Sequence, residues 1–349
     1  MTSCLTMFKP TEPSLVSSVL QNFAVPFQVD EGVITLPGEF ALQLGGVLRD
    51  VRVAWRLAGA TNAPVVAVLG GISAGRNVFP VSNDASGWWK EVVGIDHALD
   101  ANRFRILGID FLGGSGQSTG PSRGQSNFPS ISAYDQVELL TKLLPHIGVN
   151  RLHAIVGASY GGMVALAFAE RYPNLVERIV VISAADRPHP MASAWRAIQR
   201  ETVRALAAHG DGATGLKLAR ALAMATYRSP QEFSQRFSGP PNLRDGVWRL
   251  PVEDYLYARG QSYADNYVPE AFVCLSESID LHQVDATRIH LPTTLVAVRE
   301  DQLVPLSDMQ ALHAKLAGEK RLVEFSSLYG HDAFLKEALT LKQVFAEAL

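Results

Sequence analysis

The sequence predicts an α/β fold in which a mostly parallel sheet is covered by helices on both faces. Six short apolar runs rich in Val and Ile are typical of strands buried on both faces, and they span residues 64–71, 104–114, 152–159, 178–186, 292–301 and 321–332. Helical patterns at 131–148 and 161–173 lie between several of these runs. This alternation of strand and helix predicts a layered α/β sheet.

The alternation is interrupted between residues 187 and 288, where one helical pattern follows another. We therefore expect an α/β core made of residues 26–186 and 289–349, with a helical lid inserted at 187–288. Residues 238–251 are expected to form a loop between two helices of this lid.

The N-terminal part of the chain differs from the rest of the core. Residues 1–25 are interrupted by Pro10 and Pro13, lack the unbroken apolar segment of a signal peptide, and are expected to be a poorly ordered tail. Residues 32–59 alternate between apolar and polar positions and turn at Gly45–Gly46. That pattern predicts an antiparallel hairpin at the sheet edge.

Composition excludes several classes of protein. The formal net charge of −3 over 349 residues gives no electrostatic reason to expect a nucleic-acid or membrane partner. No apolar run approaches the ~18–20 residues of a membrane span, so we expect a cytoplasmic protein. The two cysteines, Cys4 and Cys274, form neither a disulfide framework nor a metal-binding spacing, and a reducing compartment is the simpler interpretation.

A serine lies between glycines at the end of one apolar run. Gly157-Ala-Ser159-Tyr-Gly161 matches Gly-x-Ser-x-Gly, the nucleophile elbow, in which a strand turns sharply into a helix and exposes the serine oxygen. A Cβ at either glycine would collide with the neighbouring strand or helix. The alternative is a glycine-rich turn whose serine only caps the helix, and the flanking strand and helix signals argue against it.

A nucleophilic serine needs a histidine base and a carboxylate that fixes the tautomer of the base. On this type of sheet the acid and then the histidine follow the serine along the chain, each after a strand. Asp301 and His331 satisfy both requirements. Glu300 is the adjacent competitor for the acid, and Asp186 is a more distant one.

An oxyanion requires two backbone N–H donors, one of them from the residue after the nucleophile. Tyr160 follows Ser159 and supplies the first donor. The loop at 69–75, which follows an early strand, is the expected source of the second, at Ile72 or Gly71. Together with the triad, these donors predict acyl transfer.

The triad alone does not separate a hydrolase from an acyltransferase. From about residue 32 to its end, however, the chain resembles the MetX-type homoserine O-acyltransferases, which have the α/β-hydrolase fold. The markers lie at 87–89, 99–122, 157–163, 194–203, 218–229, 262–282 and 329–335. The segment with "GGSGQSTGPS" at 113–122 and the terminal "GHDAFL" at 330–335 are more specific than the elbow segment "GASYGGM".

The resemblance implies roles for particular residues. The family's triad falls on Ser159, Asp301 and His331, and its oxyanion donors fall on Ile72 and Tyr160. The resemblance also implies three substrate-binding residues. Arg200 in the lid would bind the carboxylate of the amino acid, Tyr227 lies in the same region, and Asp332 beside the histidine would face the ammonium. Without the resemblance, these three would be read as a solvated arginine, a core tyrosine and a helix cap.

The resemblance also implies a ping-pong reaction of methionine biosynthesis, with acyl-CoA as co-substrate and L-homoserine as acceptor. No metal and no bound cofactor are required. The lid is expected to limit competing hydrolysis, and the resemblance implies a homodimer through the lid helices.

Two segments depart from the pattern of many relatives. The oxyanion loop reads "GGISAGR" and the aspartate segment reads "REDQLVP". Arg76 directly follows the oxyanion loop and is a candidate partner for the free carboxylate of a succinyl group. This hypothesis favours succinyl-CoA slightly over acetyl-CoA as donor. The alternative is that Arg76 is an ordinary surface arginine.

Three other functions compete with the leading one. The acceptor can be serine, because one methylene is worth only ~1–3 kcal/mol of discrimination. A carboxylic ester hydrolase uses the same triad, and water as acceptor would leave Arg200 and Asp332 without a role. A non-catalytic binding protein on this fold would be expected to have a broken triad, whereas all three members are present in order.

Overall fold

The computed structural model describes residues 27–81 and 86–349, so the tail expected at 1–25 lies outside the described residues. An eight-stranded sheet, in the order β1-β2-β6-β3-β7-β8-β11-β12, forms the core. Every pairing from β6 to β12 is parallel. The parallel strands are β3 (Val65–Leu69), β6 (Arg105–Ile109), β7 (Leu152–Ala158), β8 (Val176–Ile182), β11 (Thr293–Val298) and β12 (Lys320–Phe325). Each lies mainly within one of the six expected runs, which confirms the predicted α/β fold.

The two antiparallel strands lie at one edge. β1 (Phe27–Ala41) pairs with β2 (Val47–Ala60), and β2 pairs antiparallel with β6. Gly45 and Gly46 both have positive φ in the turn between β1 and β2. The hairpin predicted for residues 32–59 is therefore confirmed, although its strands begin earlier than expected.

The inner strands of the sheet are buried on both faces because alternate side chains enter two separate cores. On β7, Ile155 joins the core under α1 (Ala133–His146) and α2 (Tyr160–Arg171), whereas Val156 joins the core under α9 (Ala338–Ala348). α8 (Leu306–Lys315) packs with the first of these cores. Short elements complete the core: β4 (Val93–Gly94), β5 (Leu99–Asp100) and the 3₁₀ turns η3 (Pro173–Leu175), η4 (Ala286–Arg288) and η5 (Gly330–Leu335).

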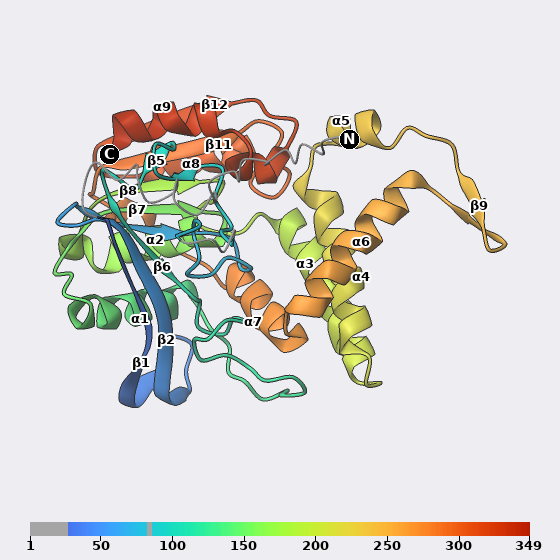
Figure 1. Cartoon of the computed structure of the whole chain (residues 1–349), viewed down its shortest axis with the longest axis horizontal. Coiled ribbons are helices and arrows are strands. Elements are labelled where there is room, and N and C mark those ends of the chain that lie inside the picture. Colours follow the sequence, from blue (N-terminus) through green and yellow to red (C-terminus); the bar gives the residue numbers. More distant parts are fainter. Residues whose placement is uncertain (1–26, 82–85) are drawn as a thin grey trace, which may run out of the picture.

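Between β8 and β11 the chain leaves the sheet and forms a set of helices that we call the helical insertion. Figure 1 shows it beside the sheet, with α4 and α6 crossing side by side. Its members are α3 (Pro190–Ala207), α4 (Gly212–Tyr227), α5 (Pro230–Arg236), α6 (Pro251–Asn266) and α7 (Pro269–Asp280).

The segment expected to be a loop at 238–251 contains a small hairpin instead. β9 (Asn242–Arg244) pairs antiparallel with β10 (Val247–Arg249), and the hairpin projects away from the sheet (Figure 1). Its turn residues Asp245 and Gly246 have φ of 52° and 77°. An Asp-Gly pair with positive φ at both positions is a strong hairpin signal, and the sequence-based interpretation overlooked it.

Within residues 27–81 and 86–349, none of the helices has the length and apolar character needed to cross a membrane.

Candidate active site

Ser159 occupies a strained position between β7 and α2. Its backbone has φ 55° and ψ −122°, a combination that non-glycine residues rarely adopt. A Cβ on Gly157 would lie 2.2 Å from the Gly161 carbonyl oxygen, and one on Gly161 would lie 2.1 Å from that of Leu69 in β3. The elbow therefore needs both glycines for the steric reason expected from the sequence.

Ser159, His331 and Asp301 form one chain of hydrogen bonds. His331 Nε2 lies 2.9 Å from Ser159 Oγ, and His331 Nδ1 lies 2.8 Å from Asp301 Oδ2. The backbone N–H groups of Leu303 and Val304 donate to Asp301 Oδ1 at 2.8 and 3.0 Å. Asp301 Oδ1 is thus held by the backbone, which leaves Oδ2 directed at the imidazole.

The two competing acids have other partners. Glu300 accepts a hydrogen bond from the Ser327 backbone N–H at 2.8 Å, and Asp186 pairs with Lys315 at 2.7 Å. Asp301, which is 4% exposed, is the carboxylate that bonds to His331. The geometry therefore favours Asp301 over both alternatives.

The surroundings of His331 favour its protonated form. Burial lowers the pKa of the imidazole, but the charge and hydrogen bond of Asp301 and the charge of Asp332 outweigh it, so the pKa lies above its usual 6.5. Arg196 acts in the opposite direction. A base of this kind captures the proton of a serine hydroxyl effectively near neutral pH.

The expected oxyanion donors lie around Ser159. Tyr160 begins α2, and Ile72 and Gly71 line the same cavity as the serine. Within the described residues, no hydrogen bond occupies the backbone N–H of Ile72 or Tyr160. Two N–H groups near the nucleophile are what an oxyanion site requires.

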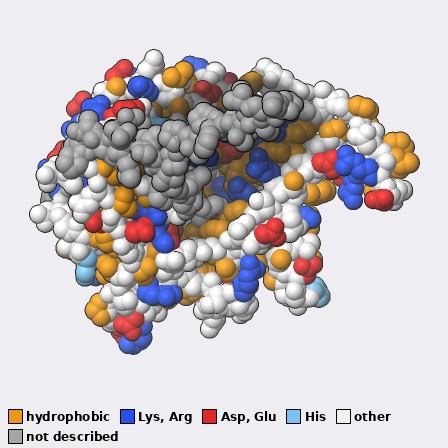
Figure 2. All heavy atoms as spheres, viewed as in Figure 1, with side chains coloured by type: hydrophobic (Ala, Val, Ile, Leu, Met, Phe, Trp, Pro, Cys, Tyr) orange, Lys and Arg blue, Asp and Glu red, His pale blue; other side chains and the backbone are white. Residues whose placement is uncertain are grey.

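The serine opens into a cavity between the sheet and the helical insertion. Its empty volume is about 1210 Å³, part of which is open solvent. The core contributes Ser159, His331 and Asp332, and the insertion contributes Arg196 and Arg220. Figure 2 shows Lys and Arg side chains together with hydrophobic ones in the hollow between these two parts. The cavity is therefore apolar with a few charged groups, as is usual for small-molecule sites.

Two arginines expected in the site have structural partners instead. Arg200 donates to Asp280 Oδ2 at 2.5 Å and to the Ser276 carbonyl at 3.1 Å, and it is not among the cavity-lining residues. Arg76 pairs with Asp110 at 2.7 Å and donates to Gln117 at 3.0 Å, also away from the cavity. The structure therefore places neither arginine among the cavity-lining residues, because each guanidinium is bound to a carboxylate elsewhere.

Arg220, which sequence reasoning missed, lies in the cavity. Its guanidinium stacks over the rings of Tyr227 and Tyr263, at 5.3 and 4.6 Å from their centroids. Of the ion pairs between described residues, none includes Arg220. Burial lowers its pKa, but Tyr227, Tyr263 and Asp332 outweigh burial and raise it, so the group stays charged. The available signal was its place two helical turns before Tyr227 on α4.

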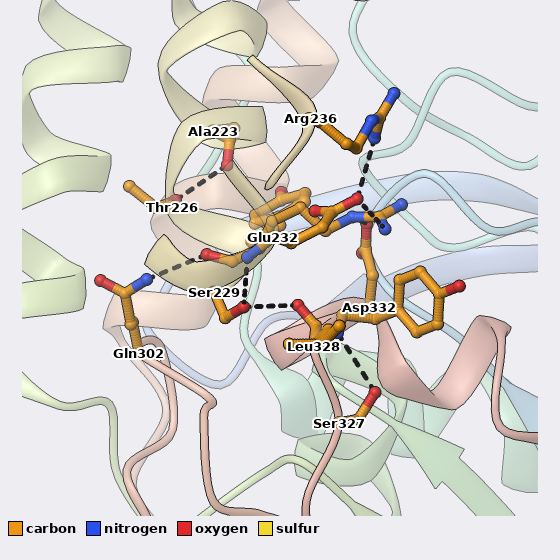
Figure 3. A network of polar contacts seen from close by, with 12 residues as sticks. Ala223, Thr226, Ser229, Glu232, Arg236, Gln302, Ser327, Leu328 and Asp332 are labelled. Atoms are coloured by element: carbon orange, nitrogen blue, oxygen red, sulfur yellow. Dashed lines mark hydrogen bonds and ion pairs between the residues drawn. The ribbon is translucent and has the colours of Figure 1, made fainter. Parts of the chain in front are cut away.

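Tyr227 and Asp332 both line the cavity, as expected for substrate-binding residues. The Tyr227 ring lies 5.9 Å from the His331 ring, measured between centroids. Asp332 Oδ2 accepts from Arg228 Nε at 2.9 Å, and Arg228 also pairs with Glu232 of α5. Figure 3 shows this network, in which Glu232 lies between Arg236 and Asp332 and pairs with Arg236.

The same network connects the insertion to both loops of the triad. Gln302 donates to the Arg228 carbonyl at 3.0 Å, and Ser229 Oγ donates to the Leu328 carbonyl at 2.7 Å (Figure 3). Gln302 follows Asp301 directly, and Leu328 lies three residues before His331. The segment between α4 and α5 therefore holds the two loops together.

Comparison with known proteins agrees with this architecture. Residues 64–338 match the family model described as the alpha/beta hydrolase fold. The chain is similar to two solved structures, esterase E22 (TM-score 0.82, 20% identity, covering 92% of this chain and 99% of that one) and homoserine O-acetyltransferase from Bacillus anthracis (TM-score 0.81, 19% identity, 92% and 97%). At these identities the likeness shows the fold alone.

Curated relatives are more informative. The chain is 42% identical to homoserine O-succinyltransferase of Xanthomonas campestris pv. campestris over 93% of its length and 85% of that protein. It is 30% identical to serine O-succinyltransferase of Litchfieldella anticariensis (90% and 97%) and 32% identical to homoserine O-acetyltransferase of Trichormus variabilis (88% and 91%). The elbow, the triad geometry and these identities together make the chain a member of the MetX-type homoserine O-acyltransferases, within the α/β-hydrolase superfamily.

Proposed function

We propose that this enzyme transfers the succinyl group of succinyl-CoA to the hydroxyl of L-homoserine, as a step of methionine biosynthesis. The observation that carries the proposal is the pairing of a serine triad with the unneutralised Arg220 and with Asp332 in one cavity. The 42% identity to a homoserine O-succinyltransferase supports succinyl-CoA as donor.

In the first half-reaction, His331 Nε2 takes the proton of Ser159 Oγ, and the oxygen attacks the thioester carbonyl. The N–H groups of Ile72 and Tyr160 receive the oxyanion of the tetrahedral intermediate. The C–S bond breaks, His331 returns the proton to the departing thiolate, and Ser159 is left as its succinyl ester.

In the second half-reaction, His331 takes the proton of the homoserine hydroxyl, which attacks the acyl-serine. Collapse of the intermediate releases O-succinylhomoserine, and the proton returns to Ser159. Homoserine is a zwitterion, so its site needs both a cation and an anion. Arg220 binds the carboxylate and Asp332 faces the ammonium, with Arg220 replacing Arg200 in the role expected from the sequence.

Two other functions compete with this one. Serine as acceptor is supported by the likeness to a serine O-succinyltransferase. Ester hydrolysis is the other, because the same triad can use water as acceptor. A hydrolase uses water as acceptor, so it has no need of a cation without an ion-pair partner among the described residues, Arg220, and a carboxylate, Asp332, in the same cavity. The unneutralised charge of Arg220 therefore favours an amino-acid acceptor.

The deciding experiment measures thiol release by the purified protein from succinyl-CoA and acetyl-CoA, each with homoserine, serine or no acceptor. We expect release that depends on homoserine, is faster with succinyl-CoA, and disappears in Ser159→Ala. Release at the same rate without an acceptor, alongside rapid cleavage of p-nitrophenyl acetate, would establish a hydrolase instead.

We also propose that two copies associate through the helical insertion. Several large apolar side chains are exposed there, among them Ile198 on α3 at 58% and Trp248 on β10 at 67%. Such a group of exposed apolar residues is typical of a protein interface. Sedimentation should give the mass of a dimer for the wild type and of a monomer for Ile198→Asp; a monomeric wild type would contradict the proposal.

A further inference from the structure

Two arginines of α3 share one carboxylate beside the catalytic cavity. Arg196 donates through Nε and Nη2 to Asp280 Oδ1 at 2.9 and 2.7 Å, and Arg200 donates to Asp280 Oδ2 at 2.5 Å. The neighbouring acid Glu277 pairs with Arg204 instead, at 3.6 Å. One carboxylate balances only one of the two guanidinium charges, so this cluster retains a positive charge.

The excess charge faces the cavity through Arg196. Ala192, Trp195, Arg196 and Gln199 of α3 all line the cavity, as expected for positions on one face of a helix. Arg200 is directed instead to α7, where it also donates to Ser276. Both side chains are 12% exposed, so a ligand that reached Arg196 would interact with a largely desolvated charge.

Arg196 is also close enough to the triad for its charge to act on the reacting groups. It lowers the pKa of His331, whereas Asp301 and Asp332 raise it. The guanidinium thus lies on the insertion side of the cavity, across from the side chain that would carry the acyl group.

Of the arginines that line the cavity, Arg196 and Arg220 differ in their surroundings. Arg220 lies near Asp332, which is bound to Arg228 through Oδ2 only, so the second oxygen of Asp332 together with Arg220 matches a zwitterion. The anion nearest to Arg196 is Asp280, whose two oxygens are already bound to Arg196 and Arg200. An anion without an accompanying ammonium is therefore the better match for Arg196.

We propose that Arg196 binds the terminal carboxylate of the succinyl group and so determines the choice of acyl donor. This inference rests on the proposed function, because it concerns the donor of that reaction. It also assigns to Arg196 the role that the sequence suggested for Arg76. An acetyl group has no such carboxylate and gains nothing from Arg196.

The test compares Arg196→Met with Arg200→Met, a matched control that also loses a bond to Asp280 but does not line the cavity. For each enzyme, kcat/KM is measured with succinyl-CoA, acetyl-CoA and butyryl-CoA at saturating homoserine. Butyryl replaces the succinyl carboxylate by a methyl group. We expect Arg196→Met to lose about 10- to 100-fold with succinyl-CoA and to change little with the two uncharged donors. Arg200→Met should keep the wild-type ratio between donors.

Equal losses with all donors in Arg196→Met, or an equal change of donor ratio in Arg200→Met, would overturn the proposal and leave Arg196 as a structural partner of Asp280. If Arg196→Met does not fold, Arg196→Gln retains a donor for Asp280 and gives the same comparison. A wild type that does not prefer succinyl-CoA to butyryl-CoA also overturns the proposal. Failure of the proposed function is distinct, because the wild type would then show no homoserine-dependent thiol release with any donor.

Discussion

The sheet edge and the helical insertion contribute to one cavity in different ways. At the sheet edge, glycine contacts and backbone hydrogen bonds fix Ser159, His331 and Asp301 within narrow limits. In the insertion, Arg196 and Arg220 are positioned by ion pairs and aromatic rings. The same fold occurs in an esterase and in an acyltransferase. From this difference we infer that the sheet edge supplies the triad chemistry, and we propose that the insertion supplies the charged groups that choose the substrates.

The largest expected effect comes from the acid at the sheet edge. Asp301→Asn should lower kcat by about 10³- to 10⁴-fold, because the amide no longer holds His331 in the tautomer that accepts the serine proton. The adjacent Glu300→Gln, which loses only a carboxylate bound to the Ser327 backbone, is the control and should stay within a few-fold of wild type. Steady-state thiol release measures both. Comparable losses of kcat in the two variants would show that Asp301 is not the acid of the triad.

A smaller and more selective effect is expected in the insertion. Arg220→Met should lower kcat/KM for homoserine by about 100-fold, because the acceptor carboxylate loses its cation in a desolvated site. Cleavage of p-nitrophenyl acetate, which needs only the sheet edge, should remain close to wild type. A parallel loss of esterase activity, or a change of donor ratio like that expected for Arg196→Met, would contradict this division.

The smallest effect should be a shift in the pH profile. His331 acts as a base when neutral, so activity should fall as the pH decreases through its pKa, which lies above 6.5. Asp332→Asn removes an anion that raises this pKa and should move the acid limb to lower pH, whereas Arg196→Met removes a cation that lowers it and should move the limb to higher pH. Cleavage of p-nitrophenyl acetate across pH 5 to 9 measures the limb without homoserine. Shifts of the same sign would show that these charges do not act on His331.

Much of the fold was predictable because its signals are local. The six apolar runs each specify a strand, although β12 lies at the sheet edge and is only partly buried. The two glycines of the elbow predict a close approach of the backbone, and the structure contains it. The order of Ser159, Asp301 and His331 along the chain was also enough to expect them together, since the carboxyl ends of parallel strands meet at one edge.

The charged residues of the cavity were harder to predict, because the carboxylate that pairs with an arginine can lie far from it in the sequence. Arg200 and Arg220 both lie on amphipathic helices, and the difference between them depends on Asp280, which follows Arg200 by 80 positions. Arg76 was excluded in the same way, by Asp110 on a different segment. No pattern within a single helix or loop reveals which guanidinium already has a partner.

The contacts of Arg228 and Ser229 have a consequence for protein engineering. Chimeras that exchange acceptor preference by grafting a relative's insertion would cut the chain near its two junctions with the core. Such a graft also exchanges the segment whose Arg228 carbonyl and Ser229 hydroxyl hold Gln302 and Leu328, and thereby alters the support of the two loops that bear Asp301 and His331. The transferable unit is therefore discontinuous, since it includes residues 302 and 327–332 together with the insertion.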